Sequence, residues 1–137
     1  MTIVVDASCV GAMLFDENVP PAVENVLATL YSLEVVIPAL WYWEVANSAL
    51  NATRRNQLAE TEVLDQLRDM CRFQITIDNE SLPHAWETTL LLAFRHGLTA
   101  YDAAYLELAI RRGLPLATLD GPLADAASAE GVEVIGG

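Results

Sequence analysis

Five short apolar segments recur along the chain, and longer segments whose apolar residues are spaced by three or four positions separate them. The short segments are continuous apolar runs rather than alternating patterns, which is typical of strands buried on both faces. They cover residues 2–6, 34–38, 74–78, 114–120 and 132–135. Short strands that alternate with helices predict a parallel sheet with helices on both faces.

The segments between these runs predict helices. Prolines stand where helices should begin, and Gly97 and Gly113 stand where two of them should end. The predicted helices cover residues 7–15, 20–33, 39–55, 57–73, 82–97, 98–112 and 121–131. We therefore expect one α/β domain over residues 1–137, with three layers and a central, mostly parallel five-stranded sheet flanked by helices.

The helix over residues 39–55 has two distinct faces. Its expected core face contains Tyr42, Trp43, Val45, Ala46, Ala49 and Leu50. Its polar stripe contains Glu44, Asn47, Ser48 and Asn51. The aromatic residues beside this stripe can pack in the core and in a dimer, or stack on single-stranded bases, and we favour packing.

The composition is that of a globular protein. Apolar residues make up 53% of the 137 residues and charged residues 19%, which excludes a disordered chain. The sequence begins without the basic segment of a signal peptide, and no apolar run can cross a bilayer, so we expect a cytoplasmic protein without membrane contact. Cys9 and Cys71 lie in apolar contexts, and we interpret both as small buried residues.

The net charge of −12 opposes broad binding of nucleic acid through its phosphates. All seven basic residues are arginines, and four of them form two adjacent pairs, Arg54 with Arg55 and Arg111 with Arg112. Each pair can be a solvated helix end or a fork that binds phosphate or carboxylate, and we favour the helix end. The acidity also allows a basic protein partner.

Four acidic residues stand where a parallel sheet presents ligands, near the carboxyl ends of its strands. Asp6 and Asp120 end the first and fourth predicted strands, and Asp102 lies in the first turn of the helix before the fourth strand. Each of these three can be a helix cap, and Thr99 with Asp102 resembles a capping box. Glu44 lies in the middle of its helix, where a solvated face is the plain alternative.

Together the four acids predict a metal site. Crowded carboxylates raise one another's pKa unless a cation neutralises them. A donor set made only of oxygen suits Mg²⁺ or Mn²⁺ rather than zinc. The two histidines, His84 and His96, lack zinc-ligand spacing and are expected at the surface or at helix ends. Glu107 is expected on a wet helix face, paired with Arg111.

Four segments in order resemble the PIN domain, and within it the VapC-type toxins of bacterial toxin–antitoxin pairs. They are IVVDASCVGAML, IPALWYWEVANSAL, LTAYDAAYLELA and LPLATLDGPLADAA, and together they extend over essentially the whole chain. The acidic positions of the family fall on Asp6, Glu44, Asp102 and Asp120. Asn47 and Thr118 fall on neighbouring motif positions, and Asp125 can be an additional outer acid or a solvated helix residue.

The resemblance implies a metal-dependent endoribonuclease that acts as a growth-inhibiting toxin and that a cognate antitoxin holds in check. It also implies an RNA substrate, a homodimer, and contact with DNA only through the antitoxin. The four acids would be the Mg²⁺ or Mn²⁺ ligands and the catalytic residues, with Glu44 acting directly or through water. Ser8, Asn47 and Thr118 would support the ligands or contact phosphate, or else serve as a local cap and a cross-strand contact.

Three other classes of protein fit less well or stay open. A response-regulator receiver normally has a late lysine, and this chain has no lysine. A haloacid-dehalogenase-type phosphatase has Asp-x-Asp after its first strand, but Ser8 stands at the third position here. A non-catalytic interaction subunit of the same fold stays open, with caps at all three aspartates. A titration of the melting temperature with Mn²⁺ distinguishes it from the nuclease.

Overall fold

The computed structural model describes residues 1–15, 19–29, 32–55 and 58–136. Its five strands lie where the apolar runs predict them and form one sheet in the order β3-β2-β1-β4-β5, with every neighbouring pair parallel. They are β1 (Thr2–Val5), β2 (Glu34–Ile37), β3 (Gln74–Ile77), β4 (Leu116–Ala117) and β5 (Val134–Ile135). The expected parallel sheet is therefore confirmed, although the last two strands are shorter than their apolar runs.

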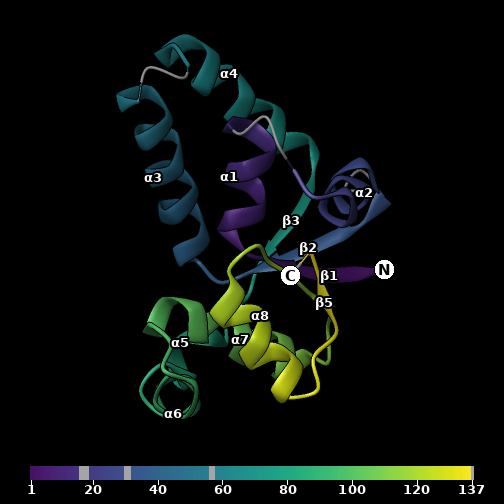
Figure 1. Cartoon of the computed structure of the whole chain (residues 1–137), viewed down its shortest axis with the longest axis vertical. Coiled ribbons are helices and arrows are strands. Elements are labelled where there is room, and N and C mark those ends of the chain that lie inside the picture. Colours follow the sequence, from purple (N-terminus) through teal and green to yellow (C-terminus); the bar gives the residue numbers. More distant parts are fainter. Residues whose placement is uncertain (16–18, 30–31, 56–57, 137) are drawn as a thin grey trace.

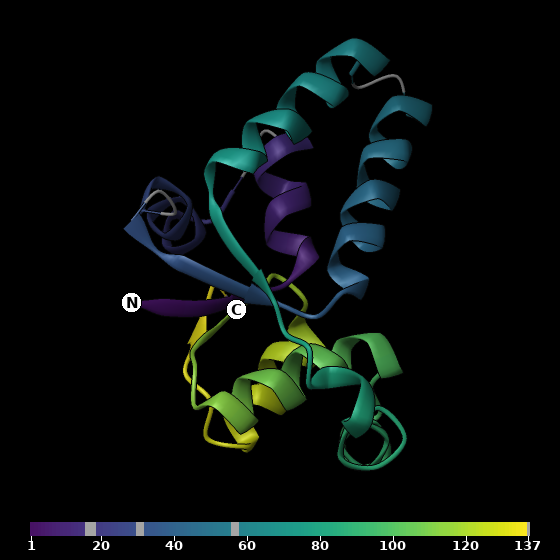
Figure 2. The same ribbon diagram turned by 180° about the vertical axis from the view of Figure 1, so that it is seen from behind.

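Helices cover both faces of this sheet, as Figure 1 shows, and Figure 2 shows the same layers from behind. They are α1 (Ala7–Phe15), α2 (Pro21–Thr29), α3 (Leu40–Arg54), α4 (Glu60–Asp69), α5 (Ser81–His84), α6 (Thr88–His96), α7 (Ala100–Arg112) and α8 (Gly121–Ala129), with a short 3-10 turn, η2 (Met70–Arg72), after α4. Helices α1, α3 and α4 lie on one side of the sheet, and α7 and α8 lie on the other. Within the described ranges, no helix is long and apolar enough to span a bilayer.

The core lies on both faces of the sheet and includes the layer between the central strand and α7. Ile3 and Val4 of β1 are completely buried, and so are Leu106 and Leu108 of α7. Helix α7 is fixed at both ends by the expected residues. The Thr99 side chain accepts a hydrogen bond from the backbone N–H of Asp102 at its start, and Gly113 adopts φ 64° after its end, where glycine is favoured.

Two helices differ from the prediction. The residues that α3 buries are Trp41, Val45, Ala49 and Ala52, whereas Trp43 is 78% exposed. Apolar residues extend around more than one side of this helix, so their spacing left the buried face ambiguous. The assignment of Trp43 to the core was wrong, and so was that of Tyr42 and Leu50, which are 46% and 47% exposed. The helix predicted over residues 82–97 is divided into α5 and α6, because Glu87 leaves helical geometry at φ −122° and ψ −97°.

A cluster of ion pairs joins the end of β3 to the end of α7. Arg111 donates to Asp78 and to Glu107, each at 2.6 Å, and Arg112 donates to Asp78 at 2.9 Å. Both carboxylates are almost fully buried, so the expectation of a wet face for Glu107 was wrong, although its predicted pairing with Arg111 is confirmed. This cluster fixes α7, which carries Asp102 at its other end, against the edge of the sheet.

Candidate active site

Four separate elements bring the four predicted acids to one hollow of about 250 Å³. Asp6 follows β1, Glu44 lies on α3, Asp102 lies in the first turn of α7, and Asp120 follows β4. The hollow is lined by Asp6, Ala7, Ser8, Glu44, Asn47, Ser48, Asp102 and Asp120. We call it the acidic hollow. It lies at the carboxyl ends of the strands, where ligands bind in open α/β sheets.

Asp6 is held in place by two hydroxyl groups. It is 4% exposed, and its Oδ2 accepts hydrogen bonds from Ser8 Oγ and Thr118 Oγ1, both at 2.7 Å. Ser8 Oγ in turn accepts from the backbone N–H of Leu119, and Thr118 Oγ1 accepts from that of Asp120. Ser8 is therefore a link between β1 and the segment after β4, rather than the helix cap that was one expectation for it.

Glu44 is tied to the opposite side of the acidic hollow. Its Oε1 accepts a hydrogen bond of 2.6 Å from the hydroxyl of Tyr105, which lies on α7 and is fully buried. Burial raises the pKa of Glu44, and the bond from Tyr105 partly opposes this effect. Sequence reasoning assigned Tyr105 to packing only. Its position three residues after Asp102, on the same helix face, was the available signal.

Asp120 is the cap of α8, Asp102 lies in the first turn of α7 that Thr99 caps, and both line the acidic hollow. The side chain of Asp120 accepts a hydrogen bond from the backbone N–H of Leu123 at the start of α8. The backbone N–H of Asp102 donates to Thr99 Oγ1 at the start of α7. The two interpretations of these residues are thus compatible, since each helix start fixes the position of a carboxylate that lines the acidic hollow.

The crowding of these groups changes their acidity. Burial contributes most to raising the pKa of Asp102, and the charges of Asp120 and Asp6 add to it, so that the pKa lies at about 6. Burial also raises the pKa of Asp6, although the hydrogen bonds from Thr118 and Ser8 act against it. Carboxylates that hold protons this strongly are stabilised by a bound cation.

The donor set fits a hard divalent cation, since the acids that line the acidic hollow offer oxygen alone. Within the described ranges, no group of three or more His, Cys, Asp or Glu side chains lies close enough together to hold a metal ion. The acidic hollow therefore has the right chemistry for a metal but not a preformed cage.

Other candidate residues lie away from the acidic hollow. Asp125 is exposed on α8 and does not line it. His84 ends α5, and His96 ends α6, where its Nε2 lies 2.8 Å from Glu130 Oε1, so their expected position at helix ends is confirmed. Cys9 is buried as expected, but Cys71 is exposed, which corrects the expectation that both are buried.

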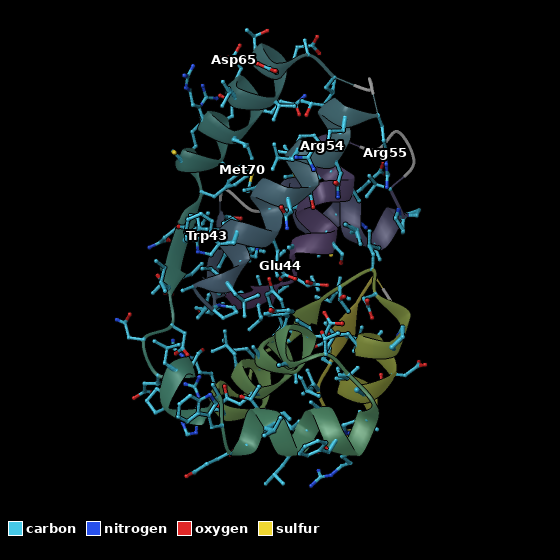
Figure 3. All side chains as sticks on the ribbon, turned by 90° about the vertical axis from the view of Figure 1, so that its left-hand side faces the viewer. Trp43, Glu44, Arg54, Arg55, Asp65 and Met70 are labelled. Atoms are coloured by element: carbon cyan, nitrogen blue, oxygen red, sulfur yellow. The ribbon has the colours of Figure 1, made fainter. Side chains whose placement is uncertain are left out.

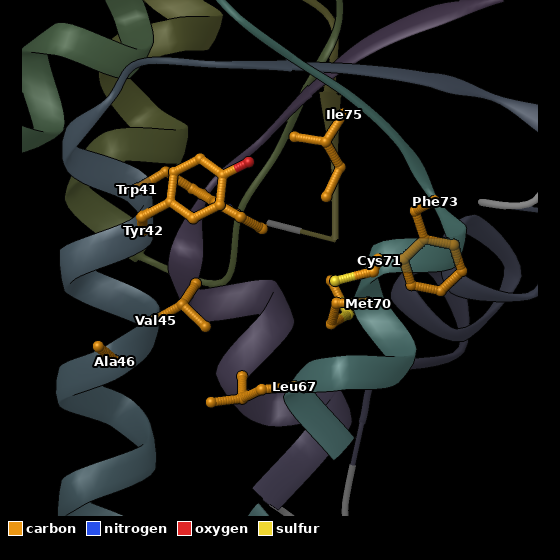
Figure 4. Close-up of a pocket in the computed structure, with 9 residues that line it drawn as sticks. All are labelled: Trp41, Tyr42, Val45, Ala46, Leu67, Met70, Cys71, Phe73 and Ile75. Atoms are coloured by element: carbon orange, nitrogen blue, oxygen red, sulfur yellow. The ribbon is translucent and has the colours of Figure 1, made fainter. Parts of the chain in front are cut away.

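A second, apolar groove of about 400 Å³ lies between α3 and the segment from α4 to β3. Figure 4 shows the side chains that line it, with those of α3 facing those of the turn after α4. They are Trp41, Tyr42, Val45, Ala46, Leu67, Met70, Cys71, Phe73 and Ile75. We call it the apolar groove. It offers no group for catalysis, but it is an open apolar surface of the kind that binds another protein.

Comparisons with known proteins agree with this architecture. The sequence profile of the PIN domain matches residues 3–129. The chain is similar to Ribonuclease VapC3 of Pyrobaculum aerophilum, with 34% identity over 125 residues, which are 91% of this chain and 94% of that protein. Its fold is similar to that of PAE2754 from P. aerophilum (TM-score 0.71, 22% identity, 98% of this chain and 89% of that one) and of FitAcB from Neisseria gonorrhoeae (TM-score 0.60, 18% identity, 98% and 96%). The chain therefore belongs to the PIN domain family and is of the VapC type within it.

Proposed function

We propose that this protein is a metal-dependent endoribonuclease and the toxin of a type II toxin–antitoxin pair. The observation that carries the proposal is the convergence of four acids from four separate elements on one hollow, where the pKa of Asp102 is raised to about 6 by burial and by neighbouring carboxylates. The similarity to a protein named a ribonuclease, over nearly the full length of both chains, supports RNA as the substrate.

Asp6, Asp102 and Asp120 would hold Mg²⁺ or Mn²⁺, with Glu44 as a ligand directly or through water. When bound, the metal would lower the pKa of a water molecule and offset negative charge on the scissile phosphate. Ser8 and Thr118 support this arrangement, because their hydroxyls orient the Asp6 carboxylate. Asn47, which also lines the acidic hollow, would donate a hydrogen bond from its amide to a phosphate oxygen.

Glu44 is our candidate for the general base. Its carboxylate can accept a proton from the attacking water while the water oxygen bonds to phosphorus, and the ester oxygen on the other side leaves. The hydrogen bond from Tyr105 to Oε1 fixes the orientation of the Glu44 carboxylate. Partial burial raises the pKa of Glu44, which makes its carboxylate a better proton acceptor. Both features come from the meeting of α3 with α7 across the acidic hollow.

The proposed function is tested by expressing the chain with and without the gene next to it and mapping the 5′ ends of cellular RNA. We expect growth arrest and new RNA ends only without the neighbour. In parallel, the purified chain should cleave RNA with Mn²⁺ or Mg²⁺ and lose this activity in a chelator. Unchanged growth and RNA, together with a melting temperature that does not respond to Mn²⁺, would favour a non-catalytic interaction subunit.

We propose that the antitoxin docks in the apolar groove and contacts DNA on behalf of the complex. The groove is apolar, and α4 beside it carries Glu60, Glu62, Asp65 and Asp69. An antitoxin segment with one apolar face and basic flanking residues would match both features, and the net charge of −12 would attract it.

Cys71 reports on this docking. It lines the apolar groove and is exposed, whereas Cys9 is buried and burial raises the pKa of its thiol to about 12, so Cys71 is the thiol that a maleimide reaches. We expect fast labelling of Cys71 in the free protein and strong protection once the protein from the neighbouring gene is bound. The Cys71→Ser variant, which should not label, is the control, and labelling at the free rate in the complex would contradict this location.

We also propose a homodimer that forms through α5 and α6. Trp86 between these helices is 91% exposed and Phe94 on α6 is 74% exposed, and exposed apolar surface of this kind marks protein–protein contact sites. Sedimentation equilibrium measures the outcome. The parent should have the mass of two chains, the Phe94→Glu variant should shift toward one chain, and a parent with the mass of one chain would contradict the proposal.

A further inference from the structure

A polar groove of about 170 Å³ runs between α1 and α3 and is continuous with the acidic hollow, since Ser8 and Ser48 line both. We call it the α1–α3 groove. The two helices approach closely here, because a Cβ atom at Gly11 would lie 3.1 Å from Ser48 Oγ. The missing side chain at Gly11, which lines the groove, therefore leaves room for the Ser48 side chain between the two helices.

One face of α3 supplies a line of polar side chains along this groove. Glu44, Ser48, Asn51 and Arg55 are spaced by four, three and four positions, which places them on one helix face. The line starts at the acidic hollow and ends at Arg55, which lines the far end of the groove. Eleven helical positions extend over roughly 16 Å. Figure 3 shows Glu44 on the first half of α3 and Arg55 just after its last turn, well apart along the helix.

Arg55 differs from most other cations of this protein. Five arginines form ion pairs with nearby acids, at Arg68, Arg72, Arg95, Arg111 and Arg112. Arg55 and its neighbour Arg54 form none with the residues that the structure describes, and of these two only Arg55 lines the α1–α3 groove. In a chain with a net charge of −12, an exposed guanidinium at the end of a polar groove, without an ion pair to any described residue, attracts an anion locally.

We propose that the α1–α3 groove guides the sugar–phosphate backbone of single-stranded RNA away from the acidic hollow, and that Arg55 binds a phosphate a few nucleotides from the cleaved bond. This inference rests on the proposed ribonuclease activity. Phosphates need cations, and the net charge of the chain is −12, so a strand that enters the acidic hollow gains affinity from a local contact of this kind. Asn51 lies between the two ends and can donate a hydrogen bond to the sugar–phosphate backbone, whereas the Ser48 hydroxyl donates to the backbone oxygen of Glu44 and can accept a bond from a ribose hydroxyl.

The test compares cleavage of a long and a very short single-stranded oligoribonucleotide of mixed sequence, both with Mn²⁺. For the long one, Arg55→Gln is expected to raise KM roughly tenfold at unchanged kcat, because it removes one charge-assisted contact. The slope of log(kcat/KM) against the logarithm of the salt concentration should become less steep by about one unit, because one phosphate contact is lost. For the short one, which cannot reach Arg55, KM should stay the same. Arg55→Lys should restore most of the loss, because the charge is kept.

Arg54→Gln is the matched control, since it makes the same charge change on the same helix outside the α1–α3 groove. We expect it to behave as the parent. The inference is overturned if Arg55→Gln leaves cleavage of the long oligonucleotide unchanged, if both oligonucleotides suffer equally, if Arg54→Gln has the same effect, or if only binding of the protein partner is lost. If the parent protein cleaves no RNA, the proposed function itself fails, and this result is obtained before any variant is made.

Discussion

Replacing Asp102 by Asn is expected to reduce RNA cleavage by about a hundredfold or more while leaving the fold intact. Residues that only support metal ligands typically account for about ten- to hundredfold in activity, so the loss of a ligand should exceed that range. The amide keeps the size of the carboxylate but not its charge. The measurement is the initial rate of cleavage of one labelled RNA by the purified parent and variant at saturating Mn²⁺.

The melting temperature of the Asp102→Asn variant distinguishes a metal-binding role of Asp102 from a purely structural one. In the metal-free protein, burial and the charges of Asp120 and Asp6 disfavour ionisation of Asp102. Because its pKa is raised in the folded state, the ionised group is unfavourable above pH 6, and Asp102→Asn removes that cost. We therefore expect the metal-free variant to melt no lower than the parent at neutral pH, while the rise in melting temperature with Mn²⁺ is diminished or lost.

Asp125→Asn is the matched control for this prediction. It makes the same chemical change on α8, where the side chain is exposed and outside the acidic hollow. Cleavage and the response to Mn²⁺ should match those of the parent. Cleavage by Asp102→Asn at the parent rate would remove the basis for the metal-site proposal. If both variants lost the same amount of cleavage activity, the loss would come from the change in total charge and not from a specific site.

Replacing Arg111 by Met is expected to lower the free energy of unfolding by about 3–5 kcal/mol, because it removes a positive charge from a buried cluster and leaves the negative charges behind. Arg111 is the shared partner of Asp78 and Glu107, whose side chains are 0% and 2% exposed. Without it, Glu107 loses the arginine it pairs with, and Asp78 keeps Arg112 and Ser81 among its described partners. Urea denaturation of parent and variant at neutral pH measures the difference.

Arg68→Met separates this effect from the simple loss of a cation. Arg68 also pairs with an acid on its own helix, Asp65, but their side chains are 75% and 74% exposed. Exposed pairs contribute between about 0 and 1 kcal/mol, so we expect a small change. If the two variants lost equal stability, the burial of the Arg111 cluster would not be the cause.

The acid limit of stability follows from the same cluster. Burial alone would raise the pKa of Asp78, but hydrogen bonds from Arg111 and Ser81 and the charge of Arg111 lower it to about 2. A carboxyl with a lowered pKa in the folded state stabilises the fold above its unfolded value, near 3.8, and this contribution is lost as the pH falls toward 2. The parent should lose stability in this window, as followed by circular dichroism.

The pattern of the sequence predicted most of the architecture because its signals are local. Apolar runs of four to five residues identified the first three strands, and spacing of three and four identified the helices. Thr99 and Asp120 marked two helix starts, and the structure shows both caps. The ambiguous cases were also local ones. Helix α3 has apolar residues on several sides, so spacing alone selected Trp43 for the core instead of Trp41.

The candidate site was foreseen in its acids but not in its supporting contacts. Asp6, Glu44, Asp102 and Asp120 were singled out from their positions relative to strands and helices, together with the resemblance to the PIN domain. The hydrogen bond of Tyr105 to Glu44 was not, since these residues are 61 positions apart. Arg111 was assigned to its helical neighbour, while its contact with Asp78 depends on how α7 meets the sheet.

The sequence by itself determined the elements, their order and the identity of the acidic residues, because propensity, capping and hydrophobic spacing act over a few residues along the chain. The tertiary structure alone decided which oxygen of Asp6 meets Thr118, 112 positions away, how far burial and crowding raise the pKa of Asp102, and that Arg55 ends a groove leading from the acidic hollow. These properties depend on distances and on exclusion of water, which exist only once the helices have packed against the sheet.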